Sequence, residues 1–181
     1  MSTRSALLLA AGALALATAA ATVAASAADS PNLGRPATPE EVAAWDISIG
    51  PDGAGLPPGA GTAKQGEAVI AANCLACHGE KGAGKPNDQL VGGQGTMASD
   101  KPAVKTVGSY WPYATTVFDY VRRAMPYTES KSLSSDEVYA VAAYILNLNG
   151  VIGESDTMDA QSLPKVKMPN RDGFVPFARG K

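Results

Sequence analysis

The sequence predicts an all-α fold with three main helices and long irregular extensions at both ends. Two capping patterns, Thr62-Ala-Lys-Gln65 and Ser134-Ser-Asp-Glu137, each precede a segment whose apolar residues recur at helical spacing. The chain shows no convincing strand pair and no internal repeat. Its 181 residues allow one domain with extensions. The net charge of −2 argues against nucleic acid as a partner, because phosphate binding needs a basic face.

The first 28 residues predict a secretory signal peptide. Arg4 precedes an uncharged stretch over residues 6–28, which ends in the small-x-small cleavage pattern Ala25-Ser26-Ala27. Cleavage would place the mature chain in the periplasm. The alternative is a retained membrane anchor, because 23 uncharged residues are long enough to span a bilayer. Contact with a membrane is expected only in that case.

Residues 29–61 predict an extended leader, since they contain six prolines and six glycines. Within it, Thr38 and Pro39 predict the start of a short helix that ends at Trp45. The first main helix then follows Thr62 and runs to about Asn73. Its apolar face contains Gly66, Val69 and Ile70.

The other two main helices are separated from the first by a glycine-rich loop over residues 79–108. One helix is predicted over residues 114–124 and is stopped by Pro126. The other starts after Ser134 and ends at Asn149-Gly150. The predicted domain spans residues 62–150, and residues 151–181 form an irregular tail packed on it. A core built from roughly 90 residues is thin, so a buried prosthetic group would help to explain how the chain folds.

Cys74-Leu75-Ala76-Cys77-His78 contains both cysteines and the one histidine of the chain. It matches CxxCH, the pattern of covalent haem c attachment, in which two thiols bond the porphyrin and the histidine binds the iron. Random placement of these three residues would give the pattern about once in 16,000 sequences of this length. We therefore expect one haem.

Three alternatives account for the motif less well. A thioredoxin-like redox pair would follow a strand, whereas residues 68–73 are predicted to be helical. A zinc site would need a fourth ligand of the usual type. A disulfide would leave His78 without a role.

The second axial ligand should be a methionine, because no second histidine exists. The candidates are Met97, Met125, Met158 and Met168. Met125 is best placed, since it follows a helix, precedes Pro126 and lies 47 residues after His78. Met168-Pro169 is the second choice.

These motifs together resemble class I c-type cytochromes. Residues 66–79 are similar to the first helix and haem motif of that family, and Met125-Pro126 with residues 133–145 is similar to its ligand loop and last helix. The resemblance implies a class I cytochrome c-like fold around one covalent haem. It also implies close packing of Gly66 against Tyr144.

Other segments resemble cytochromes of bacterial sulfur oxidation, such as the cytochrome subunit of sulfane dehydrogenase and the haem subunits of molybdenum sulfite dehydrogenases. They are Trp45-Asp-Ile47, residues 51–58, Lys105–Ala114 with its Tyr-Trp-Pro-Tyr sequence, Phe118–Pro126 and Lys167–Phe174. The resemblance covers nearly all of residues 32–177. Family members tend to place a proline close before the Leu of Leu90-Val-Gly-Gly93, but Asp88 and Gln89 stand there, so the carbonyl partner of His78 is not assigned.

A haem iron with two protein ligands has no open site for substrate, so we expect an electron carrier and not an enzyme. The resemblance implies a molybdenum dehydrogenase as the electron donor and a cytochrome or oxidase as the acceptor. The alternatives are a haem sensor or enzyme with a labile sixth ligand, and a thiol-disulfide oxidoreductase. Trp111 and Tyr110 are candidates for haem propionate contacts. Candidate pocket walls are Leu90, Val117, Phe118, Val121 and Ile145.

Overall fold

The computed structural model describes residues 33–175 and divides into two units, up to Asp46 and from Ile47 onward. The expected signal peptide over residues 1–28 lies outside the described residues. No helix within residues 33–175 combines the length and the apolar character needed to cross a membrane.

In the first unit, α2 spans Pro39–Trp45 as predicted. Thr38 and Glu41 form a reciprocal capping box, and Pro39 occupies the first helical position. The guanidinium of Arg35 forms an ion pair with the carboxylate of Glu41. None of the helical residues is buried, so local contacts account for the order of this helix.

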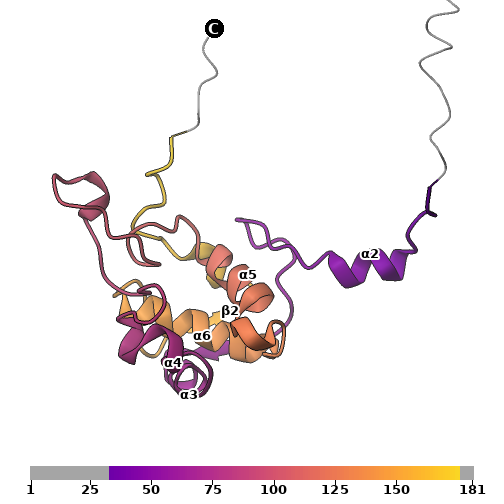
Figure 1. Ribbon diagram of the computed structural model, residues 1–181, viewed down its shortest axis with the longest axis horizontal. Helices are drawn as coiled ribbons and strands as arrows, with labels where there is room; N and C mark the ends of the chain where they lie inside the picture. The colour runs from indigo at the N-terminus through magenta and orange to yellow at the C-terminus, as the bar shows by residue number, and fades with distance from the viewer. Residues whose placement is uncertain (1–32, 176–181) are drawn as a thin grey trace, which may run out of the picture. The chain divides into compact units, whose positions relative to one another are not determined.

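The second unit contains the three predicted main helices, α3 (Ala63–Asn73), α5 (Ala114–Ala124) and α6 (Ser135–Leu148). Capping boxes from Thr62 and Ser134 start α3 and α6, as the sequence predicts. A single helical turn, α4 (Leu75–His78), follows α3 directly. Four short 3-10 turns lie in the connections, at Glu80–Gly82, Thr96–Ala98, Tyr127–Glu129 and Leu163–Lys165. Figure 1 shows these elements in one view.

A pair of short antiparallel strands corrects the prediction that the chain has none. β1 (Ala60–Thr62) pairs with β2 (Thr157–Asp159), with Gly61 opposite Met158. Each strand has only three residues, so neither shows the alternation of apolar and polar residues that identifies a strand in a sequence. The pair holds the segment before α3 beside the segment after α6.

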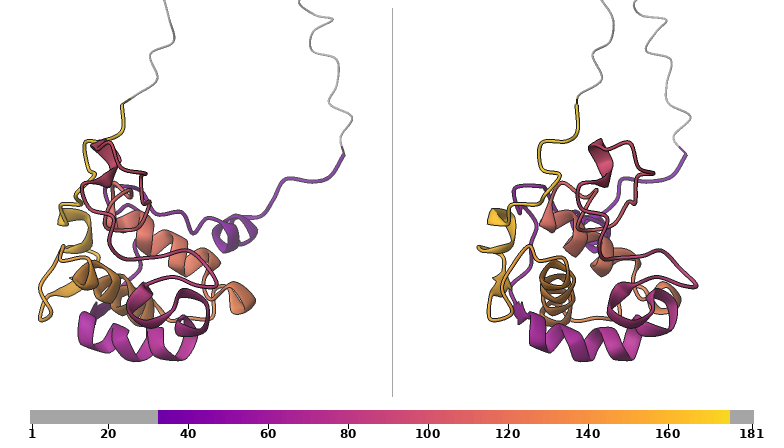
Figure 2. Two further views of the ribbon diagram at one scale, coloured as in Figure 1. Left: turned by 60° about the vertical axis from the view of Figure 1, so that its left-hand side comes forward. Right: turned by 90° about the vertical axis from the view of Figure 1, so that its left-hand side faces the viewer.

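The core of this unit is built around α6, whose residues from Val138 to Ala143 are all buried. In the right-hand view of Figure 2, α6 is seen nearly end-on while α3 runs across the picture below it, so the two helices cross. Gly66 makes this close approach possible, because a methyl group there would collide with the carbonyl of Ala140 and lie 2.8 Å from Cβ of Tyr144. The expected packing of Gly66 against Tyr144 is therefore confirmed.

The tail after α6 contributes to the same core. Met158, Leu163 and Met168 are each at most 5% exposed and belong to the buried cluster around α6. Asn170 donates a hydrogen bond of 2.7 Å from Nδ2 to the carbonyl of Tyr110. The tail thus holds the segment that leads into α5.

Candidate haem site

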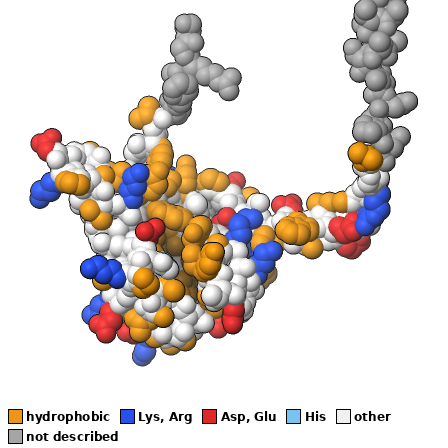
Figure 3. All heavy atoms as spheres, in the orientation of Figure 1, with side chains coloured by type: hydrophobic (Ala, Val, Ile, Leu, Met, Phe, Trp, Pro, Cys, Tyr) orange, Lys and Arg blue, Asp and Glu red, His pale blue; other side chains and the backbone are white. Residues whose placement is uncertain are grey.

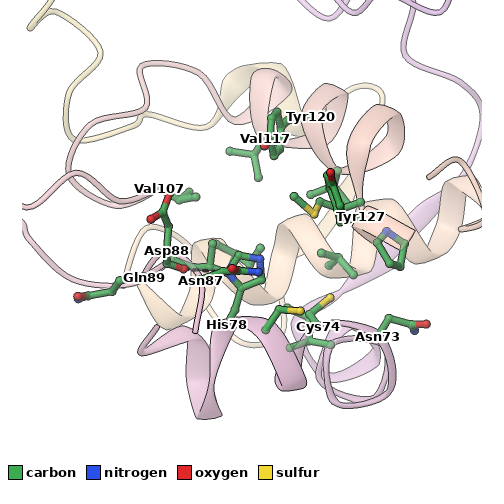
Figure 4. Close-up of a pocket in the computed structure, with 18 of the residues that line it drawn as sticks. Asn73, Cys74, His78, Asn87, Asp88, Gln89, Val107, Val117, Tyr120 and Tyr127 are labelled. Carbon is green, nitrogen blue, oxygen red and sulfur yellow. Dashed lines mark hydrogen bonds between the residues drawn. The ribbon is translucent and has the colours of Figure 1, made fainter. Parts of the chain in front are cut away.

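The second unit contains a cavity of about 540 Å³, bounded by α3, α4, α5, α6 and the loops between them. Its walls are largely apolar, and include Ile70, Leu90, Val117, Val121, Val141 and Ile145. Figure 4 shows Cys74 and His78 on one side of the space and Val117 and Tyr120 of α5 on the other. In the space-filling view, hydrophobic side chains gather around the middle of the visible face of this unit (Figure 3).

Cys74, Cys77 and His78 all line this cavity. Cys74 ends α3 and begins α4, and its carbonyl accepts hydrogen bonds from the N–H groups of Cys77 (3.1 Å) and His78 (2.9 Å). This single turn is what brings two thiols and an imidazole to the same wall. Burial and the neighbouring Cys77 thiol both raise the pKa of the Cys74 thiol.

The ring of His78 is oriented by the backbone of Asp88. Its Nδ1 lies 2.8 Å from the Asp88 carbonyl oxygen, and a carbonyl can only accept, so Nδ1 carries the proton. The lone pair of Nε2 is then left for a metal. This contact supplies the carbonyl partner that the sequence left unassigned.

Met125 reaches the cavity from the end of α5. Its N–H donates to the Val121 carbonyl at 3.0 Å and its backbone is extended, so it ends the helix before Pro126. Its half-buried side chain lines the cavity. Met168, the second choice, is 3% exposed in the core and is not among the cavity residues, nor are Met97 and Met158.

The two aromatic candidates for propionate contacts occupy different places. Trp111 lines the cavity, and its ring packs edge-on against Tyr120 with the centroids 5.6 Å apart. Tyr110 is not part of the cavity wall, because its ring packs against Phe174 at 5.2 Å and lies beside Nζ of Lys105.

Of the predicted wall residues, Leu90, Val117, Val121 and Ile145 line the cavity, whereas Phe118 does not. Phe118 is fully buried on the core side of α5, with its ring centroid 4.4 Å from that of Tyr139. Val117, Phe118 and Val121 lie on one broad apolar side of α5, part of which faces the core and part the cavity. Helical spacing could not distinguish these two parts.

The wall segments not identified from the sequence are residues 86–89, residues 105–107 and the pair Pro126 and Tyr127. None of them lies in an α-helix or a strand, so no periodic pattern marks them. Their sequence signals are the adjacent Leu90 and Met125, and for residues 105–107 their place at the start of the segment 105–114. The 85% exposed side chain of Tyr127 lies at the edge of the cavity.

These donors and walls fit a haem. The cavity presents two thiols, an imidazole whose free nitrogen is set by a carbonyl, and a thioether from another helix, within apolar surroundings. In contrast, no cluster of three or more His, Cys, Asp or Glu that could hold a metal ion occurs in residues 33–175.

A solved structure titled as the sulfane dehydrogenase SoxCD from Paracoccus pantotrophus is similar to this chain. The two share 43% identity with a TM-score of 0.76, over 83% of this chain and 74% of the other. This chain belongs to the class I c-type cytochromes. The family model described as subunit III of cbb3-type cytochrome c oxidase also matches this cytochrome, over residues 61–145. A comparison with curated proteins gave no match.

The family settles the kind of chemistry that the cavity serves. Class I c-type cytochromes bind haem c and transfer electrons, and the expected fold and resemblance are both confirmed by the comparison. The matched segment 61–145 of this cytochrome contains CxxCH, Met125 and all the residues that line the cavity.

Proposed function

We propose that this cytochrome is a periplasmic one-electron carrier with a single covalently bound haem c. Its donor is a molybdenum-containing sulfite or sulfane-sulfur dehydrogenase, and its acceptor is a cytochrome or oxidase of the respiratory chain. The observation that carries the proposal is that Cys74, Cys77 and His78 line one largely apolar cavity together with Met125 from the end of α5.

Each of these residues has one role. Cys74 and Cys77 would form the thioether bonds, and His78 and Met125 would hold the iron. When bound, the haem would supply a one-electron iron couple. The Asp88 carbonyl accepts a hydrogen bond from the Nδ1 proton of His78, which leaves the lone pair of Nε2 free for the iron.

The cavity walls set the conditions for this couple. Val117, Val121 and Ile145 exclude water and lower the local dielectric, which favours the reduced state and raises the potential. A thioether ligand acts in the same direction. With a side chain at both axial positions, no coordination site remains for a substrate, so the residues support electron transfer and not catalysis.

The proposed donor rests on the likeness to the SoxCD structure, whose title names a sulfane dehydrogenase. The one CxxCH of this chain supports a single haem. This cytochrome would therefore receive electrons one at a time from a two-electron oxidation of a sulfur compound.

The direct test follows reduction of the purified oxidised cytochrome by absorbance. We expect reduction when sulfite or a sulfane-sulfur substrate is added together with the matching molybdenum dehydrogenase, and none when either is omitted. Failure with both dehydrogenases would refute the proposed donor. Mass spectrometry should show one haem per chain and no Met1, and cell fractionation should find the protein in the periplasm.

A second measurement separates electron transfer from a sensor or enzyme with a labile Met125. Carbon monoxide should not bind to the reduced folded protein, because both axial positions are filled. Binding without loss of the fold would favour the sensor. Titratable thiols without a haem absorbance would instead indicate a thiol-disulfide oxidoreductase.

A further inference from the structure

The acceptor that orients His78 belongs to a loop without regular structure. Residues 83–95, which include Asp88, form neither helix nor strand. The Asp88 side chain is exposed, so its own packing does not hold its carbonyl in place. The position of this carbonyl must therefore depend on contacts made by its neighbours in the loop.

Next to Asp88, the N–H groups of Asn87 and Leu90 donate to the carbonyls of Cys77 and Gly82, both at 2.9 Å. The side-chain contacts of the loop from Leu90 to Gln94 converge on Asn149, which caps the C-terminal end of α6 and is 8% exposed. Its Nδ2 donates to the carbonyls of Leu90 (3.2 Å) and Ile145 (2.8 Å). Its Oδ1 accepts from the N–H of Gly92 (3.0 Å) and from Nε2 of Gln94 (3.3 Å). The full hydrogen-bonding capacity of this amide is used, and three of its four bonds go to the loop.

The backbone of Gly108 packs closely against the side chain of Asn149. A methyl group on Gly108 would collide with the amide of Asn149 and lie 2.8 Å from Nε2 of Gln94. From the other side, Oγ1 of Thr106 donates to the Gly92 carbonyl at 2.5 Å, and the N–H of Val107 donates to the Leu90 carbonyl at 3.3 Å. The loop two residues after Asp88 is thus held between residues 106–108 and Asn149.

We propose that Asn149 is a positioning residue for the axial histidine. By binding Leu90 and Gly92, it holds the Asp88 carbonyl 2.8 Å from Nδ1 of His78 and so keeps the imidazole in one orientation. Ile145 of the same helix lines the cavity. Helix α6 therefore forms part of the cavity wall and, through Asn149 at its end, also fixes the orientation of the His78 ring. The inference rests on the proposed function, in which His78 binds the iron.

The test measures how fast the Nδ1 proton of His78 exchanges with solvent, by NMR of the reduced holoprotein. Asn149→Ala removes the side-chain bonds to the loop, so the Asp88 carbonyl separates from the ring more often, and we expect exchange at least about tenfold faster than in the wild type. Asn147→Ala is the matched control. It also removes a side-chain bond near the end of α6, from Nδ2 to the Ile152 carbonyl (3.1 Å), but none to the loop. We expect wild-type exchange in this control.

A wild-type exchange rate in Asn149→Ala, or equal acceleration in both variants, would overturn the proposal. If Asn149→Ala does not fold, Gln94→Ala takes its place, because Gln94 is exposed and its loss removes one of the three side-chain bonds between Asn149 and the loop. A smaller acceleration there supports the assignment, and an unchanged rate refutes it. Absence of covalent haem in the wild type would refute the proposed function instead, before any comparison of variants.

Discussion

The histidine side and the methionine side of the cavity are built in different ways. On the histidine side, Cys74, Cys77 and His78 come together within one turn of helix, in which the Cys74 carbonyl accepts hydrogen bonds from the N–H groups of Cys77 and His78. On the methionine side, Met125 lies 47 residues further along the chain and is placed by the end of α5 and by Pro126. The difference teaches that one site can combine residues placed by local backbone geometry, here the CxxCH motif, with a residue placed by helix packing, here Met125.

The largest effect on haem binding should come from removing the two thiols of the CxxCH motif. In the double variant Cys74→Ser, Cys77→Ser, no thioether bond can form, because serine hydroxyls do not replace the thiols. We expect complete loss of haem that stays with the chain under denaturing conditions, as measured by haem staining of a denaturing gel and by mass spectrometry. Haem that remains attached would contradict the assignment of both cysteines.

On the methionine side, Met125→Ala should abolish the sulfur-to-iron charge-transfer band near the red end of the visible spectrum, while covalent haem is retained. Met168→Leu is the matched control, because Met168 is buried in the core and is not part of the cavity wall. It should keep the full band. Survival of the band in Met125→Ala, with loss in Met168→Leu, would reverse the ligand assignment.

A third variant tests the close crossing of α3 and α6. Gly66→Ala should lower the free energy of unfolding by about 2–3 kcal/mol, since the added methyl group forces the helices apart. Denaturant titration measures the loss. Lys64→Ala, at an exposed position of α3, should stay within about 0.5 kcal/mol of the wild type. Equal losses would mean that the crossing adapts to the methyl group.

The smallest effects compare the two helix caps. Thr62→Ala at the start of α3 and Ser134→Ala at the start of α6 each remove a reciprocal capping box, and each should cost about 1 kcal/mol in denaturant titrations. The exposed Ser132→Ala serves as a control for serine removal and should change stability by less than about 0.5 kcal/mol. A clearly larger loss of stability at one cap would show that α3 and α6 differ in how much they depend on their N-terminal caps.

The predictions that succeeded concern local rules. The three main helices, the short helix α2 and their caps follow from side-chain spacing within a few residues, and the structure confirms them. The pairing of β1 with β2 was missed, because a three-residue strand carries no readable alternation and its partner lies about 95 residues away. Phe118 was assigned to the cavity wall but lies in the core, because the one apolar side of α5 is shared between the core and the cavity.

At the site itself, the carbonyl that orients His78 is another contact that the sequence could not predict. Asp88 stands where family members tend to have a proline nearby, and its side chain gives no sign that its backbone would serve as the acceptor. Every residue offers a carbonyl, so composition cannot identify which one is used. Only the folded loop, held by Asn149 and residues 106–107, brings this oxygen to the ring.

By itself, the sequence determined that the chain has one CxxCH motif, that its only histidine stands in it, and where its helices begin and end. These follow from spacing along the chain, which a single helical turn converts directly into geometry. The sequence favoured Met125 but left Met168 open, and it named both Trp111 and Tyr110; the tertiary structure places only Met125 and Trp111 at the cavity. Which carbonyl meets His78 was decided by the tertiary structure alone. Those outcomes depend on contacts between residues tens of positions apart, which form only when α3, α5 and α6 pack around a common core.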